Sequence, residues 1–479
     1  MVSNNATPRI GPAQLIRDVL YRAPRSAVAW SLVGTLLRIL GGLIVLPLSV
    51  RKLPSEHLGL WYVFVSLQGI ASLFDLGFSP AVTRAAGYLW AGAQKLKTFG
   101  VEQIDQTNQD RGPNYEVLKD LVATMRLYYR FFGIAFGLIM LVAGGSWIWF
   151  KTQDLPDASL LRWCYALFVF GGFLNATGDL WPALLSGINA VQSAQKILLG
   201  STFINILITI AGLLAGYGIW ALVLGTIAGG FFLRRAGRFS FLFRAGSRLK
   251  GRSAPKLELI GTLWPTAWRS GLVSLGGFLV LSANTLICSS FLGLSTTASF
   301  GLSVSLIAML AAASSAFTVI KLPLANQFRA AGNLNEITDI WIRRTRISII
   351  AYITGGALLF FGLNFALQTV GSHTMALPRG QLALALLIFG LEMHHVLYAG
   401  LVITENRNPF VLPALISGLA TVVLSLILTP RIGVWGLLLA QGFVQVCFNN
   451  WWTIYRAIHG LGFSGKDYWE RYFRTPIRF

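Results

Sequence analysis

The chain has 479 residues, of which 54% are hydrophobic and 12% are charged, and it carries 39 Lys and Arg residues against 18 Asp and Glu residues. So few charged side chains cannot cover the surface of soluble domains of this size, which excludes a water-soluble globular protein. The excess positive charge does not form a basic stripe on a soluble fold, so we expect no nucleic-acid partner.

Long apolar segments divide the chain. A helix needs roughly 20 apolar residues to cross a hydrocarbon core of about 30 Å. Twelve stretches meet this length, and they centre on residues 27–49, 58–78, 130–150, 161–184, 198–216, 218–233, 264–288, 298–319, 347–366, 381–402, 410–429 and 434–455. The sequence therefore predicts an all-α polytopic membrane protein with about twelve transmembrane helices.

The basic residues gather in alternate gaps between these segments. If the N-terminus is cytoplasmic, 30 of the 39 Lys and Arg residues lie in cytoplasmic gaps and tails, six lie in outside gaps, and Arg38, Arg130 and Arg269 fall inside or at the edge of helices. The positive charge of short loops sets membrane orientation. We therefore predict a multi-pass protein with both termini in the cytoplasm.

The most basic stretch between apolar segments, 234–262, separates six predicted helices from six others. We expect residues 1–233 to form an N-terminal lobe, 263–455 a C-terminal lobe and 456–479 a cytoplasmic tail. Two halves with the same orientation are related by a pseudo-two-fold axis along the membrane normal, with a substrate site between them. The basic stretch itself is expected to lie against anionic lipid.

Each half opens with a helix that carries an arginine and a Gly-Gly pair. Arg38 precedes Gly41 and Gly42, and Arg269 precedes the pair that begins at Gly276. When the two halves are aligned on the outside turns that follow these two helices, Arg38 and Arg269 do not coincide. Their positions differ by about eight residues.

Other segments have less regular patterns. Residues 11–23, 80–93 and 462–479 mix apolar and basic side chains, as interfacial helices do. Residues 94–118 are polar and lack periodicity, so a cytoplasmic loop is expected there.

Signatures of soluble enzymes are lacking in the sequence. It contains no GxxxxGK[ST] phosphate loop, no GxSxG elbow and no HExxH pair, and its three cysteines have no CxxC spacing. We expect neither catalysis nor a bound metal or cofactor.

Two arginines inside apolar spans are candidate binding residues, because a charge at the bilayer centre costs about 2.5 to 3.5 kcal/mol even on permissive insertion scales. Arg38 either pairs with a carboxylate such as Asp75 or Asp179, or lines a water-filled cavity; the cavity is preferred because midplane placement is costly. Arg269 is expected about five residues from the start of its helix, where it either snorkels or contacts substrate.

Four further ionisable residues are candidates for ion pairing or proton coupling. Asp75 either caps the helical segment that begins near Pro80 or takes part in such a site. Asp179 is either the partner of an arginine or a proton carrier. Glu392 and His395 share a helix face by i,i+3 spacing, and they form either a proton-coupled site or a satisfied buried hydrogen bond.

The run Leu58-Gly59-Leu60-Trp61-Tyr62 through Leu73-Phe74-Asp75-Leu76-Gly77-Phe78-Ser79-Pro80-Ala81-Val82-Thr83-Arg84 resembles the second-helix region of bacterial polysaccharide-biosynthesis membrane proteins, the O-antigen flippase family. Leu184-Leu185-Ser186-Gly187-Ile188-Asn189 resembles the turn after the fourth helix of that family. Residues 321–346, with Pro323, Asn333 and Arg343, resemble its loop after the eighth helix.

The resemblance implies a two-lobed exporter of the multidrug/oligosaccharidyl-lipid/polysaccharide superfamily in the bacterial inner membrane. Such proteins move undecaprenyl-diphosphate-linked oligosaccharides to the periplasmic leaflet for O-antigen, capsule or exopolysaccharide synthesis. The resemblance implies that Arg38 and Arg269 contact the substrate, and that membrane lipid, a polysaccharide polymerase and chain-length machinery are partners. The energy sources that remain open are downstream consumption of the product, coupling to H+ or Na+, and the membrane potential. The alternatives are an ion-coupled multidrug antiporter and a non-transporting membrane glycan enzyme.

Overall fold

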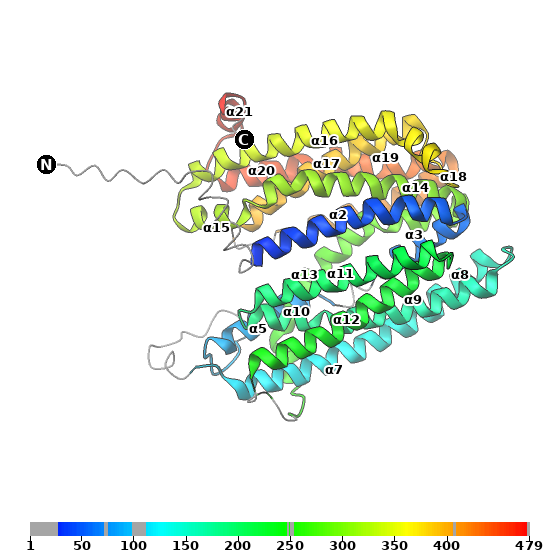
Figure 1. Ribbon diagram of the computed structural model, residues 1–479. Helices are drawn as coiled ribbons and strands as arrows, with labels where there is room; N and C mark the ends of the chain where they lie inside the picture. The colour runs from blue at the N-terminus through cyan, green and yellow to red at the C-terminus, as the bar shows by residue number, and fades with distance from the viewer. Residues whose placement is uncertain are drawn as a thin grey trace, which may run out of the picture.

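The protein is an all-helical bundle in the computed structural model, which describes residues 27–70, 75–97, 112–246, 249, 253–405 and 409–476 (Figure 1). The helices of the first half are α2 (Ala27–Lys52), α3 (Ser55–Gly69), α5 (Phe78–Trp90), α7 (Tyr115–Ile139), the π-helical turn η2 (Met140–Gly144), α8 (Gly145–Thr152), α9 (Ala158–Gly178), α10 (Leu180–Gly187), α11 (Val191–Leu214) and α12 (Ile219–Ala245). Within the described ranges there is no strand.

The second half repeats this pattern of long helices. Its elements are α13 (Glu258–Leu281), α14 (Ala283–Val319), α15 (Leu322–Ala330), α16 (Leu334–Val370), α17 (Arg379–Ile403), α18 (Val411–Ile432), α19 (Val434–Val444), the π-helical turn η4 (Gln445–Asn449), α20 (Asn450–Gly460) and α21 (Gly465–Arg474). Gly293, with φ 82° and ψ 171°, interrupts α14. The chain therefore reverses at Gly293, inside the predicted outside gap between the seventh and eighth spans.

All twelve predicted spans fall on helices. Nine helical segments of the described chain are long and apolar enough to cross a membrane, and one of them, Glu258–Ala330, contains both the seventh and the eighth predicted span. The predicted spans 58–78 and 434–455 lie outside these nine segments. The predicted span 58–78 is interrupted between α3 and α5, and the predicted span 434–455 carries polar residues around η4.

The prediction of a single helix over 58–78 is wrong in this detail. Helix α3 ends at Gly69, and α5 begins at Phe78 after a turn in which Leu76 and Gly77 both have positive φ angles, of 47° and 72°. An L-residue other than glycine rarely adopts such an angle. The described part of the second span therefore contains the end of α3 and a turn at residues 75–77, directly before α5, that includes Asp75.

Two segments predicted as interfacial helices have other surroundings. Helix α5, from the predicted segment 80–93, buries its apolar face in the core of the first lobe, so it is part of the bundle. Helix α21 lies across the end of the second lobe, where Arg471 pairs with Asp339 at 2.7 Å (Figure 1). The predicted segment 11–23 and much of the predicted loop 94–118 lie outside the described residues.

The hydrophobic cores show how the two lobes meet. At the end of the molecule with the turns after α2 and α16, which we call the far end, one core combines residues of both lobes, including Leu60 and Phe168 of the first and Leu294 and Phe389 of the second. Toward the opposite, terminal end, where α2 begins and α21 lies, one core belongs to the first lobe together with Leu263 and Ala267 of α13, and another lies within the second lobe. The lobes therefore share a core at the far end, and at the terminal end α13 packs into the core of the first lobe (Figure 1).

Close helix contacts fasten the far end. A Cβ atom on Gly59 of α3 would lie 2.0 Å from the carbonyl oxygen of Leu294 in α14, so only glycine permits this approach. The backbone N–H of His373 donates to the carbonyl of Val50 at 2.8 Å, and Ser55 donates to the carbonyl of His373 at 2.7 Å. These contacts join the first lobe to the loop between α16 and α17.

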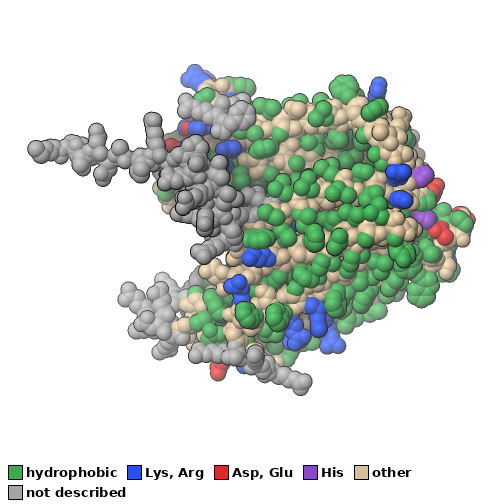
Figure 2. Space-filling model, viewed as in Figure 1, with side chains coloured by type: hydrophobic (Ala, Val, Ile, Leu, Met, Phe, Trp, Pro, Cys, Tyr) green, Lys and Arg blue, Asp and Glu red, His purple; other side chains and the backbone are tan. Residues whose placement is uncertain are grey.

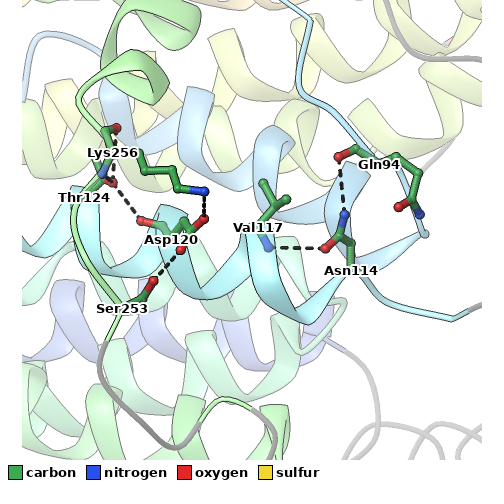
Figure 3. Close-up of polar contacts among 7 residues, drawn as sticks. All are labelled: Gln94, Asn114, Val117, Asp120, Thr124, Ser253 and Lys256. Atoms are coloured by element: carbon green, nitrogen blue, oxygen red, sulfur yellow. Dashed lines mark hydrogen bonds and ion pairs between the residues drawn. The ribbon is translucent and has the colours of Figure 1, made fainter.

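The linker between the lobes is shorter than the basic stretch 234–262. Residues 234–245 continue α12, and α13 begins at Glu258. Ser253 and Lys256 are fastened to α7 through Asp120, with the Lys256 ammonium 2.6 Å from the carboxylate, and the Lys256 backbone N–H donates to Thr124 at 2.8 Å (Figure 3). The linker is thus attached to the first lobe up to Lys256, two residues before α13 begins.

Candidate functional site

Arg38 lies in α2 on the side that faces the junction of the lobes. At about 100° per residue, Gly41 and Gly42 lie about 60° to one side of Arg38 and about 40° to the other. A Cβ on Gly41 would contact Ile206 of α11, in the first lobe, and one on Gly42 would contact Met309 of α14, in the second. Arg38 is therefore directed between the two lobes.

The opposite face of α2 is apolar and exposed, as expected for contact with lipid. It carries Leu36, Leu40 and Leu43, each more than half exposed. Arg38 is also exposed, yet on the other face, and its guanidinium donates only to Thr35, at 3.2 Å, among the described residues. No described ion pair joins it to Asp75 or Asp179, so the alternative of a structural pair with either carboxylate is not realised.

Arg269 lies eleven residues after the first residue of α13, and not five as expected, because α13 begins at Glu258. Ala267 and Gly271, about 160° away on either side, pack against the first lobe, where a Cβ on Gly271 would lie 2.9 Å from Cα of Leu76. Arg269 is exposed on the other side of the helix, with its guanidinium 5.8 Å from the Trp268 ring centroid. It is directed away from the first lobe.

The two glycine pairs make corresponding contacts, which brings the arginines closer in register than the sequence indicated. Gly41 packs on α11, the fifth span, and Gly276 packs on Ala414 of α18, the eleventh span. Arg38 precedes its glycine by three residues and Arg269 by seven, so the two side chains share a helix face one turn, or about 6 Å, apart. Counted from these glycines the offset is four residues, whereas the offset of eight residues was counted from the outside turns.

A cavity of about 230 Å³ in the first lobe contains two carboxylates, and we call it the N-lobe pocket. Asp75, Tyr129 and Asp179 line it together with Gln68 and Asn175. These residues come from the turn before α5, from α7, from the ends of α3 and α9, and from the junction of α9 and α10. The pocket thus joins residues about a hundred positions apart.

The two carboxylates of the N-lobe pocket differ in their partners. Asp75 accepts hydrogen bonds from Tyr129 at 2.5 Å and from the Ser79 hydroxyl at 2.9 Å, and it also accepts from the Ser79 backbone N–H, so the expected capping role is present. The Asp179 carboxylate has no hydrogen bond or ion pair to any described residue, and it is exposed to the pocket. The pocket therefore offers one unpaired carboxylate beside a paired one.

The turn before α5 also contacts α13. Gly77 is left-handed, and a Cβ there would lie 2.4 Å from the carbonyl oxygen of Ala267. Because Gly271 approaches Leu76 in the same place, the turn and α13 interlock through two glycines. The Asp75 turn is thus in direct contact with the helix that carries Arg269.

A second cavity, of about 220 Å³, lies in the second lobe, and we call it the C-lobe pocket. Glu392 and His395 of α17 both line it. Glu392 accepts from the Gln445 amide, and His395 Nδ1 lies 3.2 Å from the Asn449 carbonyl and 3.1 Å from the Thr453 hydroxyl. The π-helical turn η4, of a kind that is frequent at functional sites, supplies Gln445 and Asn449.

His394, the residue before His395, has other partners. Its Nδ1 lies 3.2 Å from Asn450 Oδ1, and its ring contacts Tyr398. Across the described ranges, no three His, Cys, Asp or Glu side chains are grouped closely enough to hold a metal ion.

Two residues that donate hydrogen bonds to these carboxylates were not predicted from the sequence. Tyr129 and Gln445 lie within or next to apolar spans, where a single Tyr or Gln is common and gives no signal of its own. Only the fold shows that they donate to Asp75 and Glu392.

Comparisons with known proteins identify the fold. No family model matches the sequence, and no curated protein matches it. An inward-facing multidrug resistance MATE family transporter of the MOP superfamily matches with a TM-score of 0.60 and 13% identity, over 94% of this chain and 100% of that chain. An outward-facing transporter of the same family matches with a TM-score of 0.58 and 14% identity, over 92% and 98% of the two chains.

A MOP superfamily transporter from Pyrococcus furiosus, for which reverse polarity of the binding pocket suggests a different function, matches with a TM-score of 0.55 and 15% identity, over 95% of this chain and 100% of that chain. At these identities the likeness establishes the fold. The chain is a multi-pass helical membrane protein with the two-lobed architecture of MATE transporters.

Proposed function

We propose that the protein is a flippase that moves an undecaprenyl-diphosphate-linked oligosaccharide from the cytoplasmic to the periplasmic leaflet by alternating access. The observation that carries the proposal is the position of Arg38, which is exposed on the face of α2 between the lobes and has no carboxylate partner among the described residues. A cation held there suits an anionic substrate and disfavours a cationic one. Arg269, which is exposed on α13 and directed away from the first lobe, is proposed as a second cation for the substrate.

The energetics of the substrate explain why such a cation is useful. Moving one ion from water into a medium of low dielectric costs on the order of 20 kcal/mol by the idealised Born estimate, and each unpaired hydroxyl costs about 4 to 8 kcal/mol against an alkane. A diphosphate with several sugars cannot cross unaided. A cationic, water-accessible space between two lobes removes much of that barrier.

The two ends of the molecule support an order of events. The lobes share one core at the far end, whereas toward the terminal end the second lobe also has a core of its own and α13 packs into the core of the first lobe, which supports access from the terminal end. With the termini in the cytoplasm, that is the side on which lipid-linked sugars would be loaded. Closure of the terminal end and separation at Gly59 and Leu294 would then deliver the head group to the periplasmic side.

We propose that the N-lobe pocket couples transport to H+ or Na+. Asp179 is a carboxylate with no partner among the described residues, and the amide side chains of Gln68 and Asn175 line the same cavity. Hard cations prefer such oxygen ligands. Contact of the Asp75 turn with α13 offers a route by which an ion in the pocket would affect the position of α13 and Arg269.

In the cell the proposed partners are the lipid-linked oligosaccharide, the surrounding membrane lipid of the bacterial inner membrane, and a polysaccharide polymerase with its chain-length machinery. The product of the flippase would be the substrate of that polymerase. The sugar composition does not enter the recognition proposed here, which rests on the diphosphate.

The experiment is reconstitution in liposomes that contain undecaprenyl-diphosphate-linked oligosaccharide, with a glycosidase added outside to report exposure of the head group. We expect acceleration over protein-free liposomes, a drop of at least tenfold for Arg38→Ala, and a smaller drop for Arg269→Ala. Arg51→Ala, at the far end of the same helix, is the matched control and should retain transport. No acceleration by the unaltered protein would refute the flippase, and normal transport by the Arg38→Ala/Arg269→Ala double variant would refute the roles of the arginines.

One observation favours the second candidate, antiport of cationic drugs. The N-lobe pocket combines two carboxylates with the rings of Tyr129, Phe132 and Phe136, a lining that suits an organic cation. Efflux of a cationic dye from proteoliposomes would test it. Dye transport that is lost in Asp179→Asn but retained in Arg38→Ala would support the antiporter instead of the flippase.

A further inference from the structure

A cavity of about 530 Å³ on the first lobe is lined by five arginines, and we call it the basic groove. Arg126 and Arg130 come from α7, and Arg234, Arg235 and Arg238 come from α12. Figure 2 shows Lys and Arg side chains gathered on this face between α7 and α12, within a surface that is otherwise largely hydrophobic. The sequence predicted only that the stretch from Arg234 onward lies near lipid; the arginines of α7 were not expected to join it.

The spacing of the arginines explains why they converge. Arg126 and Arg130 are four residues apart, as are Arg234 and Arg238, so each pair lies on one face of its helix. The two faces line the same groove from opposite sides, over Thr177 and Trp181 of the helices behind. The fold therefore brings two like-charged pairs together.

None of the five arginines has a carboxylate partner in the described chain. The described ion pairs of arginine, Arg456 with Glu405, Arg471 with Asp339 and Arg474 with Glu470, all lie in the second lobe. The guanidinium of Arg234 instead lies 5.7 Å from the Phe173 ring centroid. Like charges held together without a counter-charge repel one another, so an anion in the groove would stabilise this arrangement.

The mouth of the groove is apolar, and this distinguishes a lipid from a free phosphate ion. Leu127 and Phe231 line the groove and are 45% and 56% exposed, and Phe131 beside them is 64% exposed. Exposed side chains of this kind suit acyl chains, while the guanidiniums suit a phosphate. The site therefore has the two halves that a phospholipid requires.

The groove is separate from the space between the lobes. On α7, Thr124 and Tyr128 face the linker and α13 side, since Thr124 bonds Lys256 and Tyr128 packs on Phe78. Arg126 lies about 160° to 200° around the helix from these two residues. The groove is thus on another face of α7 from the one that meets α13.

The linker between the lobes forms one wall. Ser253 and Pro255 line the groove, and Ser253 is held by Asp120 of α7 (Figure 3). A head group in the groove would therefore contact both the first lobe and the segment that leads into the second.

From these observations we propose that the basic groove binds the phosphate of an anionic phospholipid from the leaflet at the terminal end. Bidentate guanidinium contacts hold the phosphate, and the apolar mouth receives the first part of the acyl chains. The proposal does not depend on what the protein transports, because the groove lies outside the space between the lobes.

The test uses the full chain in detergent, with native mass spectrometry after addition of palmitoyl-oleoyl phosphatidylglycerol or palmitoyl-oleoyl phosphatidylcholine. We expect Arg126→Gln/Arg234→Gln to weaken binding of phosphatidylglycerol at least tenfold, with little change for phosphatidylcholine. The matched control is Arg244→Gln/Arg344→Gln, which removes the same charge outside the groove and should bind as the unaltered protein does. Equal binding by the groove variant and the control would overturn the proposal.

A second arm separates a lipid from its head group alone. Glycerol 1-phosphate carries the phosphate without acyl chains, and we expect it to compete at least a hundredfold less well than phosphatidylglycerol. Competition as good as that of the lipid would overturn the assignment to a lipid and indicate a free phosphate site. Arg126→Lys/Arg234→Lys keeps the charge and loses the planar fork of donors, so it guards against misfolding: partial recovery of binding is expected, and full recovery would contradict phosphate recognition by the guanidinium fork.

Discussion

The N-lobe and C-lobe pockets are similar in size, and the first contains two carboxylates and the second one, yet their chemistry differs. In the C-lobe pocket Glu392 accepts from Gln445, and His395 is held by Asn449 and Thr453. In the N-lobe pocket Asp75 is held by Tyr129 and Ser79, but the Asp179 carboxylate has no described partner. A carboxylate whose partners are built into the fold stabilises it, whereas one that faces a cavity without partners is available to a mobile cation.

The largest effect is expected from Asp179→Asn, because an amide cannot bind H+ or Na+ as a carboxylate does. Transport driven by an ion gradient in proteoliposomes should fall by about 10- to 100-fold, while movement of substrate down its own gradient persists. Asp154→Asn, in the exposed loop before α9, is the control and should behave as the unaltered protein. Gradient-driven transport that survives in Asp179→Asn would show that the N-lobe pocket is not the coupling site.

The next effect concerns stability. Replacing Glu392 by Leu removes the acceptor of the Gln445 amide, and a buried donor left without a partner costs about 1 to 3 kcal/mol. The midpoint of thermal unfolding in detergent should therefore fall clearly for Glu392→Leu and less for Glu392→Gln, which keeps an oxygen. If instead Glu392→Gln left stability intact and abolished gradient-driven transport, the C-lobe pocket would be the coupling site and the contrast between the pockets would be reversed.

The smallest effect is expected from Tyr129→Phe, which removes the phenol that donates to Asp75. Freed of this donor, Asp75 should bind a cation more readily, so the ion concentration for half-maximal transport should decrease by less than tenfold. Tyr128→Phe is a close control, because the buried Tyr128 hydroxyl has no hydrogen-bond partner among the described residues and its removal should change little. Identical ion dependence in both variants would show that the Asp75 bond does not tune the pocket.

The number of spans and the helical class could be predicted from the sequence, because long apolar segments in a membrane protein have few other uses. The break in the second span could not be predicted from the sequence. Leu73 and Phe74 keep the segment apolar across the turn, and hydropathy does not report the left-handed backbone at Leu76 and Gly77.

The candidate residues could be identified one by one from the sequence, but the sequence did not show which of them lie together. A charged residue within an apolar span stands out in any sequence, and Arg38, Asp179 and Glu392 were named for that reason. That Asp179 shares a cavity with Asp75 depends on how the α9–α10 junction packs beside the turn before α5, and no local pattern encodes this. The basic groove is an intermediate case, because its i,i+4 arginine pairs are visible in the sequence but their convergence is not.

The fastening of the linker to α7 restricts how the halves can move. Because Lys256 is tied to Asp120 and α13 starts two residues later, almost no slack chain separates the lobes at the terminal end. The second lobe is then attached to the first at the start of α13. Its movement relative to the first lobe is a rotation about that point. Two lobes joined in this way would move together, whereas the same lobes joined by a long flexible linker would move independently of one another.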